Sequence, residues 1–238
     1  MKRKKVKVEC MTKPNWIELP IDLTKNILRR LDTVEIVTSA RNVCPLWWNV
    51  CKDPLMWSTI KMTGDFSNPL RLDKMCTASH LRRLQILGNT GISDKGLSEF
   101  LKRFSQLEEL EISHCCNSFS KDILEVIGQC CPLLKSLNLE RLSVDGMPTV
   151  YSYCKGDEAF CIAKTMSGLR HLKLLGLWLN YDELLAILDG CPLLESLDLR
   201  FCIYYSSNQS LLKRCNTYVM MIGSIRQLTL IVDDVADI

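Results

Sequence analysis

A short apolar motif recurs along most of this chain and constrains its fold more than any other feature. The motif is L-x-x-L-x-L, with other apolar residues standing in for leucine, and its copies begin at Trp57, Leu81, Leu107, Leu134, Leu169, Leu194 and Ile225. Four of the six intervals between neighbouring copies are 24 to 27 residues long. A repeat of this length holds one short strand and one helix, and such units bury a core only by stacking. The sequence therefore predicts an α/β solenoid over residues 57–238.

The segments between the copies support this prediction, because apolar residues recur in them at helical spacing. The apolar sets are Leu97, Phe100, Leu101 and Phe104; Ile123, Ile127 and Cys130; Leu184, Ile187, Leu188 and Cys191; and Leu211, Cys215, Val219 and Ile222. Helix-capping residues precede them at Ser93-Asp94, Ser120, Asn180 and Ser207-Asn208. The pattern is that of leucine-rich repeats and predicts a right-handed α/β horseshoe of about seven strand units.

One long interval contains an insertion at residues 140–168. We expect a loop that carries Tyr151 and Tyr153, followed by a helix through Ala159 and Ile162. Loops that interrupt a regular solenoid often carry function, and tyrosine offers large contact area, but for any single residue of the segment the sequence favours an insertion without a role.

The 13 cysteines are numerous, yet the chain has no C-x-x-C pair that would indicate a zinc or redox site. Two of them open matching CysProLeuLeu phrases at 131–134 and 191–194, where proline would end a helix before the next strand. Because a thiol is small and apolar, we expect buried free cysteines between stacked repeats, with no metal and no cofactor. Free thiols favour a reducing compartment, so we expect cytoplasm, nucleus or both.

Residues 14–56 form a separate, helical segment that is rich in tryptophan. Leu19-Pro20 suits the entrance of a first helix, because proline costs nothing in the first turn. The inner face of that helix would carry Leu23, Ile27, Leu28 and Leu31. Thr33 is expected to cap a second helix from Val34 to Val43, and Pro45 to open a third that ends at Asp53-Pro54. So small a unit should leave apolar surface for a partner.

The pattern W-x-x-L-P, I-L-x-x-L, V-C-x-x-W and D-P-x-x-W resembles that of F-box motifs, in particular those of plant F-box proteins with cysteine-containing leucine-rich repeats. Its residues here are Trp16, Leu19, Pro20, Ile27, Leu28, Leu31, Val43, Cys44, Trp47, Asp53, Pro54 and Trp57. The chain departs from the commonest pattern at Asp32, where many members have proline, and at Trp48, where many have arginine.

The resemblance implies a substrate-recognition subunit of a Skp–cullin–F-box ubiquitin ligase, which binds a Skp-type adaptor, through it a cullin, and a protein substrate. It implies that the adaptor-facing residues are Leu19, Pro20, Ile27, Leu28, Leu31, Val43 and Trp47. For Leu28 and Val43, adaptor contact and packing among the three helices are both open. Such a subunit is not an enzyme, since ubiquitin transfer takes place elsewhere in the complex.

Strand alternation places every second residue of each motif copy on the open, concave face of the solenoid. This face is the expected surface for the substrate. The candidate residues on it are Glu109, Glu111, Asn138, His171, Lys173, Asp198 and Arg200. Their mixed charges suit a protein or peptide partner, and they also fit an ordinary solvated face.

Other classes of function find less support. A net charge of +3 gives no electrostatic case for nucleic acid or membrane binding, and the three histidines are not grouped with a nucleophile. The basic residues of segment 1–13 fit either a disordered tail or a nuclear-import signal. Two alternatives to the ligase subunit stay open: a repeat scaffold without a ligase partner, and a small-ligand receptor closed by the insertion at 140–168.

Overall fold

A computed structural model of the chain describes residues 18–63, 80–88, 93–113, 121–140, 157–200, 202–204 and 229–231. Several sequence predictions fall outside these ranges. They concern the basic segment 1–13, Trp16, the loop of the insertion with Tyr151 and Tyr153, the caps at Ser120 and Ser207-Asn208, and the helix predicted from Leu211 to Ile222.

Seven strands form one parallel sheet in sequence order, and each comes from one copy of the motif. They are β1 (Thr59–Thr63), β2 (Arg83–Leu87), β3 (Glu109–Ser113), β4 (Ser136–Glu140), β5 (His171–Leu175), β7 (Ser196–Asp198) and β9 (Thr229–Ile231). Their register aligns equivalent motif positions, so that Leu84, Leu110, Leu137, Leu172 and Leu197 form one buried row. The predicted strands are confirmed. A separate pair joins β6 (Trp178–Leu179) to β8 (Ile203–Tyr204).

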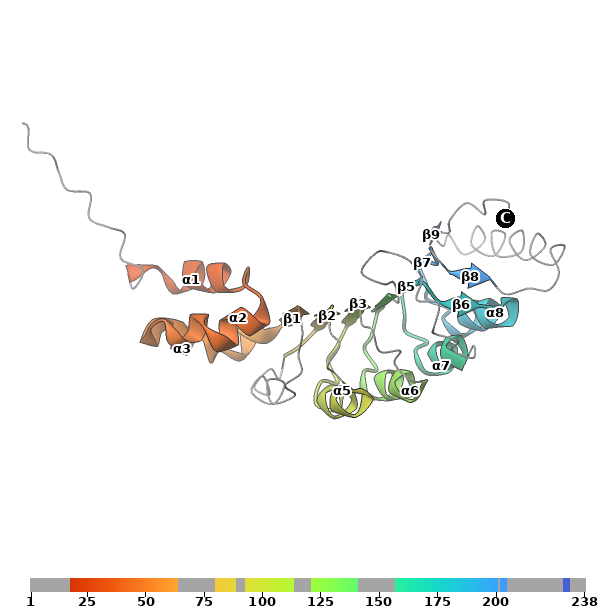
Figure 1. Ribbon diagram of the computed structural model, residues 1–238, viewed down its shortest axis with the longest axis horizontal. Helices are drawn as coiled ribbons and strands as arrows, with labels where there is room; N and C mark the ends of the chain where they lie inside the picture. The colour runs from red at the N-terminus through yellow and green to blue at the C-terminus, as the bar shows by residue number, and fades with distance from the viewer. Residues whose placement is uncertain are drawn as a thin grey trace, which may run out of the picture.

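Among the described residues, four helices lie on one face of the sheet, and no described helix lies on the other (Figure 1). They are α5 (Asp94–Leu101), α6 (Lys121–Cys130), α7 (Asp157–Thr165) and α8 (Tyr181–Gly190). Two of the predicted caps form: the Ser93 side chain accepts a bond from the Gly96 amide, and Asn180 makes a capping box with Glu183. Neighbouring helices approach closely at glycines. A Cβ on Gly190 would lie 2.3 Å from the Ala163 carbonyl oxygen.

The two cysteines before proline lie at the corners between helix and strand, as predicted. Cys131 and Cys191 are buried, and burial raises their thiol pKa values to about 12 and about 11. The Cys191 thiol also donates to the Met166 carbonyl oxygen at 3.6 Å. All seven cysteines that the structure describes are free thiols.

A helical module stands at the β1 end of the sheet (Figure 1). It contains α1 (Ile21–Leu28), α2 (Thr33–Thr38), the 3-10 turn η2 (Ala40–Asn42), α3 (Pro45–Cys51) and the 3-10 turn η3 (Pro54–Trp57). One continuous hydrophobic core runs from Leu28 in this module to Leu199 in the repeats. The module therefore packs as the first layer of the solenoid.

The second helix of the module differs from the prediction. Asp32, not Thr33, is its N-cap, because the Asp32 carboxylate accepts from the Val34 amide and the Asp32 amide donates to the Glu35 carboxylate. The helix ends at Thr38 rather than Val43. The Asn42 side-chain amide donates a hydrogen bond of 3.1 Å to the Thr38 carbonyl oxygen.

Thr33 instead attaches the module to the sheet. Its buried hydroxyl accepts the Lys61 amide of β1 at 2.9 Å, and the Thr63 hydroxyl donates to Asp32 at 2.7 Å. Trp57 completes the joint, since its buried indole donates to the Cys51 carbonyl oxygen at 2.9 Å.

The inner face of α1 also differs from the prediction. Leu23 is exposed, and the buried position beside Leu28 is taken by Thr24. A hydroxyl can be buried there because it donates to the Pro20 carbonyl oxygen at 3.2 Å.

Candidate docking surfaces

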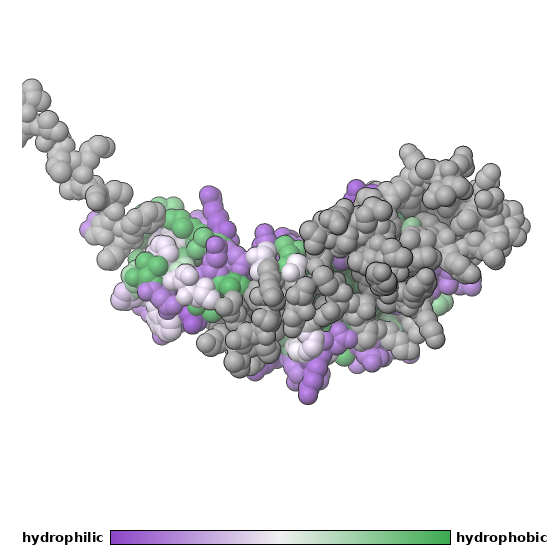
Figure 2. Space-filling model, viewed as in Figure 1, coloured by the Kyte–Doolittle hydropathy of each residue, from purple (hydrophilic) through white to green (hydrophobic). Residues whose placement is uncertain are grey.

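The helical module carries several large apolar side chains in contact with solvent. We call this set the apolar surface of the module, and it consists of Ile21, Leu23, Val43, Trp48 and Leu55. Figure 2 shows several hydrophobic areas at this end of the molecule, interspersed with hydrophilic residues. Val43 is the most exposed, at 63%. Large apolar groups clustered in a small helical unit are typical of a protein-docking site.

The structure distributes the predicted adaptor-facing residues between the core and the surface. Leu28 is fully buried, which places it in the core and removes it from a free docking surface. Val43 and Pro20 are exposed, whereas Leu19 and Ile27 are half-buried. Leu31 and Trp47 are half-buried and pack against the core. The two residues left open by the sequence thus separate: Leu28 holds the helices together, and Val43 faces solvent.

Ile21, Leu23, Trp48 and Leu55 were not among the predicted contact residues. Two cations lie over the Trp48 ring, with Arg41 5.4 Å and Lys52 5.1 Å from the ring centroid. Its indole is therefore held in place at the surface by cation–π contacts. The only sequence signal for this position was its departure from the arginine that is common there in F-box motifs.

A second surface is the concave face of the sheet. Residues from β2 to β7 line a hollow of about 390 Å³ on it. All but one of the predicted substrate-binding residues, Arg200 being the exception, line this hollow. Alternation along each strand therefore placed these side chains correctly.

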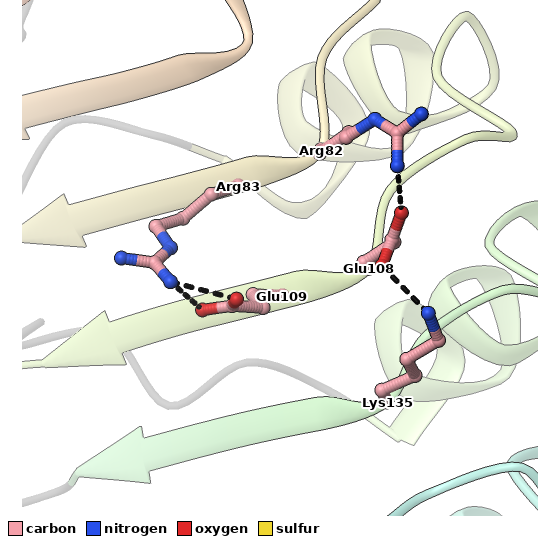
Figure 3. Close-up of polar contacts among 5 residues, drawn as sticks. All are labelled: Arg82, Arg83, Glu108, Glu109 and Lys135. Carbon is pink, nitrogen blue, oxygen red and sulfur yellow. Dashed lines mark hydrogen bonds and ion pairs between the residues drawn. The ribbon is translucent and has the colours of Figure 1, made fainter.

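Ion pairs tie neighbouring repeats together beside this face (Figure 3). Glu108 lies between Arg82 at 2.5 Å and Lys135 at 2.7 Å. The hydrogen bond from Lys135, with both positive charges, holds the pKa of Glu108 below its ordinary value. On β2 and β3, Arg83 and Glu109 pair at 2.7 Å. Glu109 is therefore already neutralised within the sheet.

Other candidates on the concave face also have partners. Arg200 binds Asp198 through two nitrogens, at 3.0 and 2.8 Å. Burial works to raise the pKa of Asp198, but the hydrogen bonds and charge of Arg200 outweigh it and lower that pKa. His171 shares a hydrogen bond of 3.0 Å with Ser196.

Glu111 differs from the other acidic candidates because its partners carry no charge. Its carboxylate accepts from the Gln85 amide at 2.6 Å and from the Asn138 amide at 3.0 Å. The Asn138 side-chain oxygen is buried and makes no hydrogen bond within the part of the chain that the structure describes.

Within the described ranges, no three metal-ligating side chains gather, and no helix is both long and apolar enough to cross a bilayer.

The fold and its surfaces define a class of protein: a repeat solenoid with a concave sheet face, fused to a helical module that exposes apolar side chains. Comparison with known proteins makes the assignment specific, because residues 16–59 match the F-box domain family. The F-box protein SKIP19 of Arabidopsis thaliana is 38% identical over 234 residues, which cover 84% of this chain and 74% of that protein.

Two further Arabidopsis thaliana relatives carry the name of the repeat. Putative F-box/LRR-repeat protein 23 is 36% identical, over 84% of this chain and 51% of that protein. Putative F-box/LRR-repeat protein 22 is 35% identical, over 84% of this chain and 74% of that protein. The chain belongs to the plant F-box proteins with leucine-rich repeats. F-box domains in general bind Skp-type adaptors, and these matches indicate no enzyme family.

Proposed function

We propose that this chain is the substrate-recognition subunit of a Skp–cullin–F-box ubiquitin ligase. The apolar surface of the module carries the proposal, since exposed side chains such as Val43 and Leu23 cost free energy in water unless a partner covers them. The adaptor contacts would then be Leu19, Pro20, Ile27, Leu31, Val43 and Trp47, joined by Ile21, Leu23 and Trp48. The substrate would bind the concave face. The subunit works in the cytoplasm, the nucleus or both.

The attachment of the module to the sheet supports this role. A receptor accelerates ubiquitin transfer by holding its substrate near the conjugating enzyme, so the two binding surfaces must keep a fixed relation. The bonds from Lys61 to Thr33 and from Thr63 to Asp32, with the shared core, supply that rigidity. No catalytic group in the chain itself is required.

The test is a pull-down with a plant Skp-type adaptor. Val43→Glu puts a charge at the most exposed point of the apolar surface, where it should leave the fold intact but weaken adaptor binding at least about tenfold, since an unpaired charge would be buried in the complex. Leu133→Glu is a matched control, because Leu133 is an exposed leucine between α6 and β4. Undiminished binding by Val43→Glu would refute the docking surface. No binding by the unchanged chain would refute the ligase role and favour a repeat scaffold without an adaptor.

A further inference from the structure

The middle row of the concave face carries a regular charge pattern. The register of the sheet lines up Lys61, Gln85, Glu111, Asn138, Lys173 and Asp198 across six consecutive strands. Charged and neutral side chains alternate from Lys61 to Lys173, and the sixth member, Asp198, is charged and paired with Arg200. The first five members of the row read positive, neutral, negative, neutral, positive, with Lys61, Glu111 and Lys173 as the charged residues.

Within the described ranges these three charges form no direct ion pair, unlike others nearby, although Arg83 lies within electrostatic range of Glu111 and Asp198 within range of Lys173. Arg83 neutralises Glu109, and Arg200 neutralises Asp198. Glu111, by contrast, is bonded only by the neutral amides of Gln85 and Asn138. Among the described residues, neither Lys61 nor Lys173 forms an ion pair with an acidic side chain.

The row lies in hollowed surface along its length. Glu111 and Lys173 line the hollow of about 390 Å³, and Lys61 lines a neighbouring hollow of about 430 Å³ between the module and β1. Gln85 lines both, so the two hollows meet at the second member of the row. A chain crossing the strands could therefore contact all three charges.

The spacing of the charges selects the conformation of such a chain. Neighbouring strands lie about 4.8 Å apart, so successive charges of the row are about 9.6 Å apart at the backbone. A polyproline II segment rises about 9.3 Å in three residues and returns to the same face after three. In a β-strand, side chains on one face are about 6.7 Å apart, or about 13.4 Å for every second one, and neither distance matches the spacing of about 9.6 Å between the charges. Seven residues of α-helix rise about 10.5 Å, which is too long, since side chains converge on a concave face.

We propose that the middle row binds an extended, polyproline II segment of a target protein with the pattern acidic-x-x-basic-x-x-acidic. The two acidic side chains pair with Lys61 and Lys173, and the basic side chain between them pairs with Glu111. This inference rests on the proposed role as a substrate receptor and specifies the class of substrate. Both hollows are open to solvent, so each pair is worth little, and recognition comes from three pairs in register.

The test uses two labelled peptides of equal composition, with proline at several x positions. Peptide 1 has the order acidic-x-x-basic-x-x-acidic, and peptide 2 has acidic-x-x-acidic-x-x-basic. Fluorescence anisotropy with the unchanged 238-residue chain at low salt should show peptide 1 binding at least about tenfold more tightly than peptide 2. The double variant Glu111→Lys/Lys173→Glu should reverse the preference, because its row reads positive, positive, negative. This rescue by peptide 2 also shows that the variant is folded.

Two controls complete the experiment. Lys164→Glu, an exposed charge reversal on α7, should leave both affinities unchanged. A helical peptide with the same three charges seven residues apart should bind more weakly than peptide 1. Equal binding of the two peptides, an unreversed preference in the double variant, or tighter binding of the helical peptide would overturn the inference. Because no adaptor is present, failure here leaves the adaptor pull-down unaffected, and the converse also holds.

Discussion

At the scale of single residues, the polar groups beside the sheet act mainly on their neighbours. Glu108 illustrates this, since Arg82 and Lys135 approach the same carboxylate from the repeats before and after it (Figure 3). All three side chains are partly exposed, so solvent screens the pairs and each contributes at most about 1 kcal/mol.

Because the pKa of Glu108 is lowered in the folded state, the stabilisation by its ion pairs depends on pH. A depressed folded-state pKa means that the ionised carboxylate stabilises the fold above the ordinary value of 4.5, and that this stability is lost as the pH falls through the lower folded value. We therefore expect Glu108→Gln to lower the urea midpoint slightly at pH 7. At about pH 3 the difference from the unchanged chain should shrink. An equal difference at both pH values would mean that Glu108 acts through packing and not through charge.

At the scale of helices and strands, substitution of two helical glycines by alanine should have opposite effects on stability. Gly190 at the end of α8 lies against the backbone of Ala163, which cannot give way, whereas a Cβ on Gly96 in α5 would meet only the Ser93 hydroxyl at 3.4 Å. Gly190→Ala should therefore destabilise the fold by about 1–3 kcal/mol through overpacking. Gly96→Ala should stabilise it by about 0.5–1 kcal/mol through helix propensity. Thermal unfolding of both variants measures the contrast, and a stabilised Gly190→Ala would show that α7 and α8 are further apart.

The elements also differ in how well the sequence predicted them. All seven strands could be predicted, because each motif copy confirms the others. The helices of the module occur once each, so no repeated pattern marks where they begin. The start of α2 depends on local hydrogen bonds: Asp32 is the N-cap because it forms a capping box with Glu35.

The candidate surfaces were predictable to different degrees for the same reason. Alternation along a strand fixes which side chains reach the concave face, so its residues followed from the pattern. On α1, periodicity placed Leu23 and Leu28 on one face, but the neighbours of the helix cover only Leu28. Which arc of a short helix remains open depends on packing that no local pattern contains.

At the scale of the whole molecule, the module and the repeats should unfold together, because they share one core. Four of the five tryptophans lie between residues 16 and 57, whereas far-ultraviolet circular dichroism reports mainly on the repeats. We expect the two signals to give coincident transitions.

Thr33→Val tests this coupling. The substitution removes the acceptor of the Lys61 amide and should lower the free energy of unfolding by about 1–3 kcal/mol. The midpoints of both signals should fall together. Thr38→Val is the matched control, since Thr38 is exposed at the end of the same helix and bonds only locally. Separate transitions in the variant, with only the tryptophan signal displaced, would contradict a single cooperative unit.

The joint at β1 has one more consequence. β1 is the terminal strand of the sheet, and a bare strand edge is a template for pairing with other chains. Here the Lys61 amide on that edge donates its hydrogen bond to the Thr33 hydroxyl, and the module packs against the end of the sheet. The segment that we propose as the adaptor-binding module thus also protects the edge of the sheet from pairing with other chains. A truncated variant without the module should therefore expose the β1 edge and aggregate, in addition to losing the proposed adaptor-binding surface.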